Sequence, residues 1–308
     1  MPVYIARRLA QFVPTFIGAT LAVYALAFLV PGDPARALAG EQASDPAAVA
    51  LIQQRYHLNE SFFHQYMRYL TGLFHGTLGT TYSGQSVAQS LVHKAGVTIT
   101  LAGFALLFEI LVGVSIGVFA AVRDRTVGGN GAMLFTLVVL AIPIFVSCLV
   151  MQLVLTVRFH LFPTTFVAGN LTSYILPAIA LGSISVAPIA RLTRSATLAS
   201  LQSDYVRSAR AHGLSERRVI FHALRNSLIP TVTHLGYDFG MMLSGAVVVE
   251  GVFNLPGVGN ALFQAITLKD GPTIVGIVTA LVVAYLFINL VVDLIYGVLD
   301  PRIRAHGN

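Results

Sequence analysis

The sequence has little charge, a single cysteine and no tryptophan. Charged residues make up 10% of its 308 residues, whereas a soluble domain contains about a quarter. The lone Cys148 lies in an apolar run, so it forms neither an intrachain disulfide nor the cysteine pair of a metal site. This composition excludes an ordinary soluble domain and a disulfide-stapled one.

The motifs of common enzyme classes are also missing. There is no Gly-x-x-x-x-Gly-Lys-Ser/Thr loop, no His-Glu-x-x-His, no Gly-x-Ser-x-Gly elbow and no dinucleotide fingerprint. The nine histidines are scattered, and the spacing of His57, His64 and His75 fits no standard zinc pattern. We therefore expect no catalytic residue, metal or cofactor in this chain, and no ATP hydrolysis by it.

Apolar residues dominate what is present. They form 56% of the chain, the mean hydropathy is +0.76, and several apolar runs reach about 20 residues. The net charge of +6 and the pI near 9.7 do not indicate nucleic-acid binding, because basic residues in a membrane chain usually reflect orientation. The sequence predicts an all-α polytopic membrane protein.

Six apolar runs are predicted to cross the membrane: residues 9–30, 97–122, 132–157, 173–190, 230–249 and 273–298. The first run also follows a short basic start, as in a signal peptide. Its 22 residues exceed the 7–15 of a signal core, and at ~1.5 Å per residue they reach about 33 Å, enough for the hydrocarbon core. We expect Pro143 to kink the third run and Pro177 and Pro188 to interrupt the fourth.

The segments between the runs differ in charge. Residues 32–96 form an extracytoplasmic segment with helices between Ala47 and Leu73 and a turn-rich stretch from Gly76 to Tyr82, and residues 250–272 form a second outer loop. Placing both termini in the cytoplasm puts 13 of the 19 basic residues inside, as the positive-inside rule requires. These are Arg7, Arg8, Arg123, Arg125, Arg191, Arg194, Arg207, Arg210, Arg217, Arg218, Arg225, Arg302 and Arg304.

A charged island at 203–226 separates two apolar runs and is predicted to be a cytoplasmic hairpin. Ser203 or Asp204 caps a first helix, and Gly213 ends it in the left-handed conformation. Ser215 then caps a second helix, which has Glu216 in its first turn and should stop near Asn226, ahead of Pro230. Such a surface suits docking of a soluble partner.

The same stretch resembles the "EAA" loop of ABC importer permeases. Asp-Tyr-Val-Arg-x-Ala-Arg-Ala-x-Gly at 204–213 and Leu-Ile-Pro at 228–230 are similar to the dipeptide/oligopeptide subgroup. The chain departs from the general motif because Arg207-Ser208 replaces its opening Glu-Ala, and because Pro230 comes 17 residues after Gly213. His212 stands where the subgroup commonly has lysine.

Further similarities run from end to end of the chain. They are Arg7-Arg8-Leu9, Pro31-Gly32-Asp33-Pro34, Leu176-Pro177-Ala178, Glu250-x-x-Phe253-x-x-Pro256-Gly257-x-Gly259 and Asp300-Pro301-Arg302. The long outer segment is similar to the "B" member of the heterodimeric permease pair. In that family the segment after Glu250 is a re-entrant outer gate.

The resemblance implies a type I importer fold in a single permease domain over 1–308, in the bacterial inner membrane and in contact with lipid. Its implied partners are a second homologous permease subunit, two ATPase subunits that bind ATP and Mg²⁺, and an extracytoplasmic binding protein. The implied cargo is a dipeptide or oligopeptide, with nickel chelate, glutathione or another small solute as alternatives. The ATPase-docking residues would be Ala209, Arg210, Gly213, Leu214, Ser215 and Glu216.

Polar groups inside the apolar runs have two interpretations, because buried charge is costly in a bilayer. One is a substrate path or gate, which we assign to Asp238, Glu250, Phe253 and Asn254. The other is helix packing through small residues, which we assign to Glu109, Gly113, Gly117, Gly236, Gly240 and Asp293. His234 and Asp238 are four residues apart and are expected to pair.

Two other classes of protein remain as alternatives. An intramembrane enzyme would use Asp238 and Asp293 as an acid pair and would turn over substrate without ATPase subunits. A membrane anchor would recruit a partner without transport, but it would not need polar groups inside three membrane runs.

Overall fold

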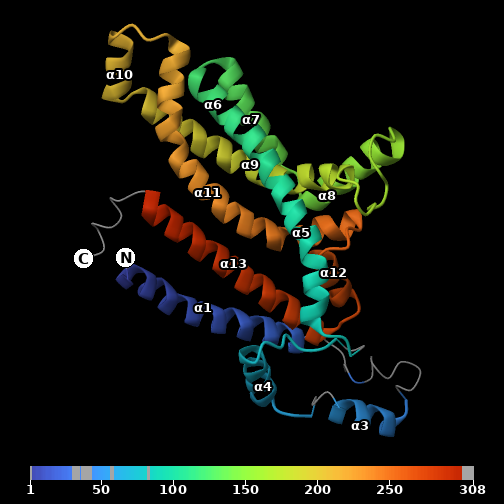
Figure 1. Ribbon diagram of the computed structural model, residues 1–308. Coiled ribbons are helices and arrows are strands. Elements are labelled where there is room, and N and C mark those ends of the chain that lie inside the picture. Colours follow the sequence, from blue (N-terminus) through green and yellow to red (C-terminus); the bar gives the residue numbers. More distant parts are fainter. Residues whose placement is uncertain (1, 30–34, 36–43, 56–58, 82–83, 300–308) are drawn as a thin grey trace. The chain divides into compact units, whose positions relative to one another are not determined.

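The computed structural model describes residues 2–29, 35, 44–55, 59–81 and 84–299 (Figure 1). The described residues form helices joined by turns, with one isolated bridge between Thr80 and Ser86. The helices are α1 (Pro2–Leu29), α3 (Pro46–Arg55), α4 (Phe62–Phe74), α5 (Val87–Glu109), the π-helical η2 (Ile110–Val114), α6 (Ser115–Val122), α7 (Val127–Ala141), α8 (Ile144–Met151), the π-helical η3 (Gln152–Arg158), α9 (Thr172–Leu201), α10 (Asp204–Ala211), α11 (Glu216–Phe253), α12 (Val258–Thr267) and α13 (Gly271–Leu299). The all-α prediction is confirmed for this part of the chain.

Contacts divide the chain into two compact units. The first contains residues 1–96 and 260–287, and the second contains residues 97–259 and 288–306. Helices α5, α12 and α13 each contribute residues to both units. The motifs at 31–34 and 300–302 lie outside the described residues.

Aromatic side chains hold the first unit together. The ring of Tyr24 on α1 meets the rings of Phe62, Tyr66 and Tyr69 on α4. The Tyr66 hydroxyl bonds that of Thr20 at 3.0 Å, and the Tyr69 hydroxyl donates to Thr279 of α13 at 2.7 Å. The pKa of the Tyr69 hydroxyl is raised to about 12, because burial disfavours its charged form. The hydrogen bond to Thr279 offsets part of the effect of burial. This polar and aromatic packing joins α4 to α1 and α13.

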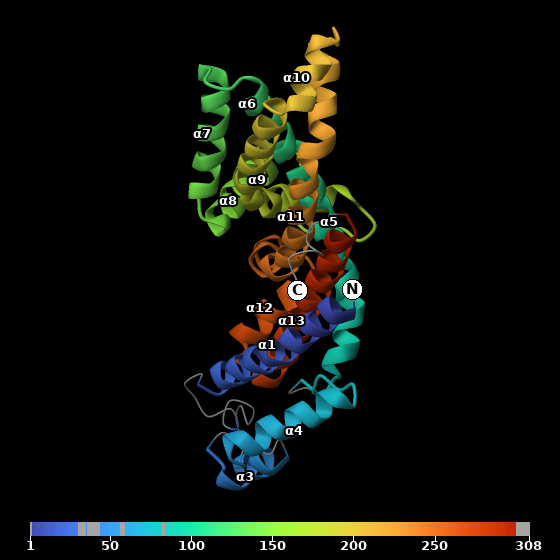
Figure 2. The ribbon, with the colours of Figure 1, turned by 90° about the vertical axis from the view of Figure 1, so that its left-hand side faces the viewer.

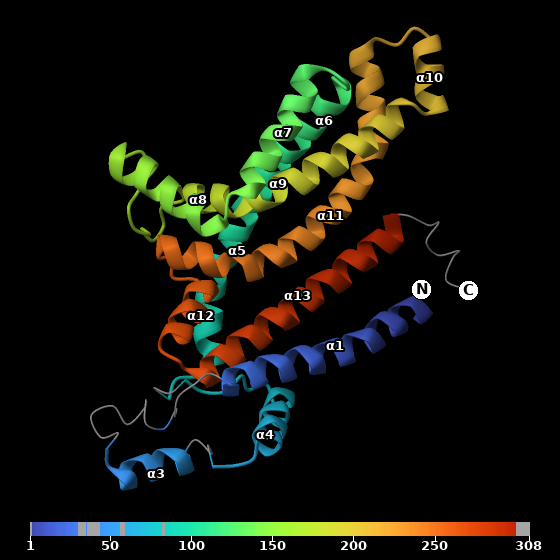
Figure 3. The ribbon, with the colours of Figure 1, turned by 180° about the vertical axis from the view of Figure 1, so that it is seen from behind.

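Helices α9 and α11 form the centre of the second unit and lie side by side, with α6 and α7 against α9 (Figures 1–3). The apolar core lies where α5, α8, α9 and α11 meet, and it contains Leu101, Leu181, Met242 and Val249. Gly182 brings α9 close to α5, since a Cβ there would lie 2.6 Å from the Ala105 carbonyl oxygen. The close approach of these helices depends on small residues.

The second helix of the 203–226 hairpin does not stop near Asn226, as the sequence predicted. α11 runs without a break through Pro230, although a proline inside a helix costs about 3 kcal/mol. Hydroxyl pairs on both sides of Pro230 bind α11 to α9. Ser227 lies 3.2 Å from Thr197, and Thr231 lies 3.3 Å from Thr193. Interhelical hydrogen bonds therefore hold the helix together where the local sequence would end it.

The predicted span at 173–190 is also longer than expected. α9 continues through Pro177 and Pro188 and ends at Leu201, so it includes Arg191 and Arg194 beyond the apolar run. Much of its length is buried against neighbouring helices, and this packing outweighs the loss of two backbone hydrogen bonds.

The third apolar run is more than kinked. Pro143 separates α7 from α8 and η3, and the two parts meet at 94°. Ile142, which precedes the proline, is extended, because the proline ring disfavours helical geometry there. Residues 128–131 form the start of α7, where Thr126 accepts a hydrogen bond from the N–H of Gly129 at 3.1 Å.

The outer segments contain more helix than predicted. Helix α12 occupies much of the expected loop at 250–272, and α5 begins at Val87, inside the expected outer segment 32–96. The helices predicted between Ala47 and Leu73 are confirmed as α3 and α4, and the turns at Gly76 and Gly79 have positive φ.

Five helices are long and apolar enough to cross a membrane, and there are six if the bent pair of α7 with α8 and η3 counts as one span. The apolar windows fall in α1, α5 to α6, α9, α11 and α13, as the sequence predicted.

Candidate functional site

Helix α10 begins where predicted but without the expected side-chain cap. Ser203 has the extended conformation of a cap residue, yet its hydroxyl donates to the Ser200 carbonyl at 2.5 Å. Asp204 opens the helix and pairs with Arg207 at 3.6 Å, consistent with an acid in the first turn.

The turn after α10 is a Schellman motif. Gly213 has φ +76°, as predicted, its N–H donates to the Arg210 carbonyl at 2.9 Å, and the Leu214 N–H donates to the Ala209 carbonyl at 3.2 Å. Leu214 then packs on the small core that joins α10 to α11, formed by Val206, Val219 and Ala223. The hairpin has its own apolar core and a defined turn.

An ion pair closes the hairpin. The guanidinium of Arg210 binds the Glu216 carboxylate through both oxygens, with Nε 2.9 Å from Oε1 and Nη2 3.3 Å from Oε2. Both side chains are exposed, and Glu216 raises the pKa of Arg210. Ser215 occupies the cap position of α11 without a side-chain cap bond. Because the pair is exposed, it adds little stability.

The structure adds two hairpin residues that the sequence reasoning missed. Phe221 is 72% exposed, and Tyr205 is also an exposed large side chain. Phe221 is offset by two residues from both Val219 and Ala223. That offset places it on the opposite face of α11 from the core, which is a signal available in the sequence.

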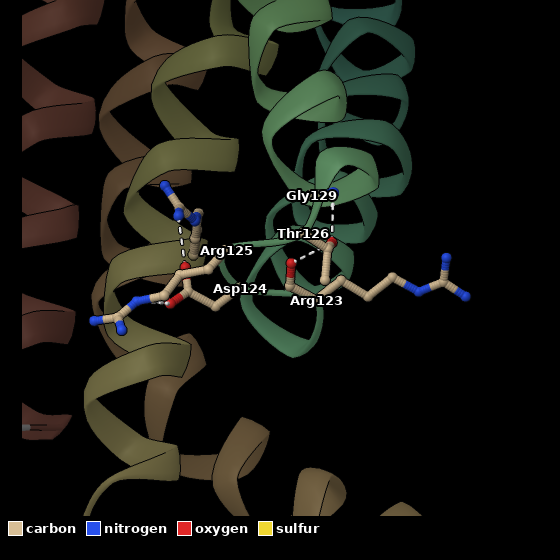
Figure 4. Close-up of polar contacts among 6 residues, drawn as sticks. Arg123, Asp124, Arg125, Thr126 and Gly129 are labelled. Carbon is tan, nitrogen blue, oxygen red and sulfur yellow. Dashed lines mark hydrogen bonds and ion pairs between the residues drawn. The ribbon is translucent and has the colours of Figure 1, made fainter.

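A second interaction lies at the neighbouring turn between α6 and α7 (Figure 4). Arg194 of α9 donates to Asp124 at 2.7 Å, and Arg125 lies 3.7 Å from the same carboxylate. Thr126 donates to the Arg123 carbonyl at 2.7 Å and caps α7. The turn is thereby tied to α9, the helix that leads into the hairpin.

The packing face on η2 and α6 contacts α9. A Cβ on Gly113 would lie 2.9 Å from Ile189, and one on Gly117 would lie 2.6 Å from the Ala190 carbonyl oxygen and from Thr193. Gly236 of α11 is similarly close to Val292 of α13, and Gly240 is buried. These positions support the packing role proposed from the small-residue spacing.

Replacing Gly117 with alanine is expected to destabilise the chain by about 1–3 kcal/mol, because the methyl group would overlap the backbone of α9. Gly131→Ala is the matched control, since it has open space around it and should be neutral or stabilising through helix propensity. Thermal unfolding of the two purified variants checks this. Equal melting temperatures would contradict the packing role.

The buried acids of the second unit have different partners. Asp238 pairs with His234 at 3.1 Å between Oδ2 and Nδ1, as predicted, and Asp293 accepts from the Tyr237 hydroxyl at 2.6 Å. Glu109 is buried beside Asp238. Sequence spacing could not bring Glu109 to α11 or Tyr237 to α13, because these contacts join residues far apart in the chain.

Glu250 lies at the end of α11 in a buried polar cluster. The Thr98 hydroxyl of α5 donates to Glu250 Oε1 at 2.6 Å and accepts from the Val258 N–H at 2.9 Å. The helix ends at Phe253, which is in the core, and Asn254 follows with φ +52°. Gly257 lies so close to the Glu250 carboxylate that a Cβ there would overlap it. Thr98 is a residue that the sequence reasoning did not identify.

Comparisons with known proteins cover nearly the whole chain. The family described as binding-protein-dependent transport system inner membrane component matches residues 113–305, and its N-terminal counterpart matches residues 1–102. The chain is 35% identical to the dipeptide transport system permease protein DppB of Escherichia coli K12 and 36% identical to the di/tripeptide transport system permease protein DppB of Pseudomonas aeruginosa. It is 35% identical to the glutathione transport system permease protein GsiC of Salmonella paratyphi A. Each alignment covers 98% of both chains.

Solved structures agree with the fold at low sequence identity. The MetNI methionine ABC transporter in an inward-facing conformation has a TM-score of 0.55 and 16% identity, covering 69% of this chain and 97% of that one. An amino acid ABC transporter has a TM-score of 0.52 and 16% identity, with 68% and 94% covered.

Proposed function

The chain belongs to the inner membrane components of binding-protein-dependent transport systems, and we propose from this premise that it moves dipeptides or oligopeptides inward. It is a multi-span permease subunit of an ABC importer, in the inner membrane. Relatives named for dipeptides, di/tripeptides and glutathione support a small peptide as cargo. Glutathione, itself a tripeptide, is the second candidate, and a nickel chelate is a more distant one.

The proposed docking site for an ATPase subunit is the hairpin of α10 and the start of α11, with Ala209, Arg210, Gly213, Leu214, Ser215 and Glu216 as its contacts. Support comes from its Schellman turn, its own apolar core and the exposed Phe221. Two ATPase subunits would bind ATP and Mg²⁺. One would dock on this hairpin and the other on its counterpart in a second, homologous permease subunit. A binding protein would deliver the cargo to the outer segments.

The continuity of α11 is the observation that carries the mechanism. One helix of 38 residues, about 57 Å at ~1.5 Å per residue, joins the hairpin to the Glu250 cluster. Closure of the ATPase subunits on ATP would move the hairpin, and α11 would transmit this movement to Glu250, Phe253 and Asn254 at the proposed outer gate. Approach and separation of the two hairpins would switch the proposed outer gate between a closed and an open state. The transport path would then be accessible from one side of the membrane at a time, which is alternating access.

The proposed orientation places both termini in the cytoplasm. The basic residues at the hairpin and at the turn between α6 and α7 support this, because cytoplasmic loops carry the excess of arginine and lysine. The Glu250 cluster then lies near the outer surface, at the far end of α11 from the hairpin.

Uptake of a labelled dipeptide into liposomes tests the proposal. The liposomes hold this chain with its co-purified subunits, the binding protein is outside, and ATP is inside. We expect uptake that depends on ATP, because the energy comes from the partner subunits. Stimulated ATP hydrolysis without peptide uptake would direct the search to glutathione or a nickel chelate. The absence of both uptake and a co-purifying ATPase would contradict the proposal.

A further inference from the structure

Helix α4 exposes large apolar side chains, although the sequence placed it outside the membrane. Phe63 is 69% exposed, Met67 57% and Phe74 85%. They follow one another at spacings of four and seven residues, so they lie on one side of the helix. We refer to Phe63, Met67 and Phe74 as the α4 stripe. A gathering of exposed apolar side chains of this kind marks a contact surface for another molecule or for a membrane.

The α4 stripe is part of a wider apolar face. At about 100° per residue, the aromatic, leucine and methionine side chains of α4 share an arc of about 160°. One half of this arc packs on Tyr24 of α1 through the rings of Phe62, Tyr66 and Tyr69 (Figure 1). The α4 stripe forms the other half, so the apolar face continues beyond its contact with α1.

The rest of the α4 surface is polar. Its exposed polar side chains are those of His64, Arg68 and Thr71. Arg68 forms an ion pair with Glu60, which precedes the helix. A helix with a broad apolar arc beside an exposed polar one is suited to lie in the interface between a membrane and water.

Contacts with α1 show the depth at which α4 lies. The apolar window of α1 ends at Ala27, and Tyr24 lies three residues inside it, ~4.5 Å along the helix axis. The Tyr66 hydroxyl reaches further, to the Thr20 hydroxyl at 3.0 Å and the Ile17 carbonyl at 3.2 Å. The apolar face of α4 is therefore level with the end of the hydrophobic part of α1.

Helix α13 gives the same depth independently. Its apolar window begins at Gly271, and the Tyr69 hydroxyl of α4 donates to Thr279 at 2.7 Å. Thr279 lies eight residues inside that window, ~12 Å along the helix axis. Helix α4 thus contacts the last turns of one span and the first turns of another, and both contacts lie within apolar windows.

The face of α1 next to α4 is itself uncovered. Val13 and Ile17 precede Tyr24 by eleven and seven residues, so they lie on the same side of α1, and both are exposed. They lie inside the apolar window, where the surroundings are hydrocarbon. Helix α4 packs on the end of a face that continues into the bilayer, which favours lipid as the neighbour of the α4 stripe.

We propose that α4 lies in the membrane–water interface at the C-terminal end of α1, with the α4 stripe in contact with phospholipid acyl chains. The polar arc then faces headgroups and water. Because the stripe contains no charged residue, it recognises apolar area and not a particular headgroup. Helix α4 would anchor the adjoining ends of α1 and α13 at the membrane surface. The inference is independent of the transported solute.

Photolabelling of the wild-type complex is the first test. The complex is reconstituted in phosphatidylcholine liposomes that contain a phosphatidylcholine with a diazirine on its acyl chain. After irradiation, we expect mass spectrometry to find lipid adducts on Phe63, Met67 or Phe74 and none on His64 or Thr71. Adducts elsewhere on the spans with none on α4 would overturn the inference. This measurement needs no variant.

Spin labels then compare the two sides of α4. Nitroxides are attached to Phe63→Cys, Met67→Cys and Phe74→Cys, one at a time, in a Cys148→Ala background that removes the native cysteine of this chain. The partner subunits are cysteine-free, and His64→Cys and Thr71→Cys are the matched controls on the polar arc. We expect labels on the stripe to collide more with oxygen, which enters lipid, than with chromium oxalate, which stays in water. The controls should show the reverse order.

The other possible neighbours of the α4 stripe give different results. Collisions with chromium oxalate as frequent on the stripe as at the controls would place the stripe in water. Few collisions with either reagent would mean that protein, such as the second permease subunit, covers the stripe. Loss of oxygen access only after addition of the binding protein would identify that protein as the occupant. Each of these three results overturns the inference, whereas oxygen access that is unchanged by the binding protein supports it.

Discussion

Replacing Gly213 with proline is expected to abolish co-purification of the ATPase subunits while the chain still inserts into the membrane. Gly213 has φ +76°, whereas proline is restricted to about −65°. Proline also removes the N–H that donates to the Arg210 carbonyl. The Schellman turn would open, and α10 would no longer pack on Val219 and Ala223.

A positive-φ glycine elsewhere provides the control. Gly169 has φ +79° and, like Gly213, has open space where a Cβ would stand. Gly169→Pro imposes the same backbone change away from the hairpin and should leave ATPase binding intact. Gly213→Asn should retain much of it, because asparagine tolerates the left-handed conformation. Normal ATPase recovery with Gly213→Pro would contradict the docking proposal.

Replacing Gly257 with alanine is expected to disrupt the Glu250 cluster and to lower dipeptide uptake at least about tenfold, with about 1–3 kcal/mol of destabilisation from overpacking. The added methyl group would overlap the Glu250 carboxylate, which is buried and held by Thr98. Moving that carboxylate would also break the link from Thr98 to the Val258 N–H. Uptake assays and thermal unfolding of the purified complex measure the two effects.

The double variant Gly257→Ala with Glu250→Ala isolates the cause. If the overlap is responsible, removing the carboxylate should recover part of the stability lost in Gly257→Ala, so the two effects should not add. Gly103→Ala is the control in a helix, because its surroundings are open. A Gly257→Ala complex as stable and active as the control would show that the cluster tolerates displacement and plays no part in gating.

Local signals predicted the hairpin well. The end of α10 at a left-handed Gly213 and the start of α11 at Glu216 follow from residues next to each other in the chain. The pairing of His234 with Asp238 also follows from a spacing of four on one helix. In these cases the interacting groups are close in sequence, so their geometry is set by the helix itself.

The sequence misled where proline was taken to end a helix. Pro230 removes a backbone hydrogen bond from α11 and is locally unfavourable in the helix. The hydroxyl pairs of Ser227 with Thr197 and of Thr231 with Thr193 nevertheless hold α11 against α9 on both sides of Pro230. The described residues show no such hydroxyl pair beside Pro143, and the helices before and after this proline meet at 94°. Prolines with the same local preference therefore have opposite outcomes.

By itself, the sequence determined the membrane class, the positions of the apolar runs and the charged hairpin, since these depend on composition and on short-range backbone preferences. Only the tertiary structure decided that α11 joins the hairpin to Glu250 as one helix, that Thr98 holds Glu250, and that Glu109 faces Asp238. These features depend on contacts between residues far apart in the chain, whose free energy outweighs local preference and leaves no periodic signal in the sequence.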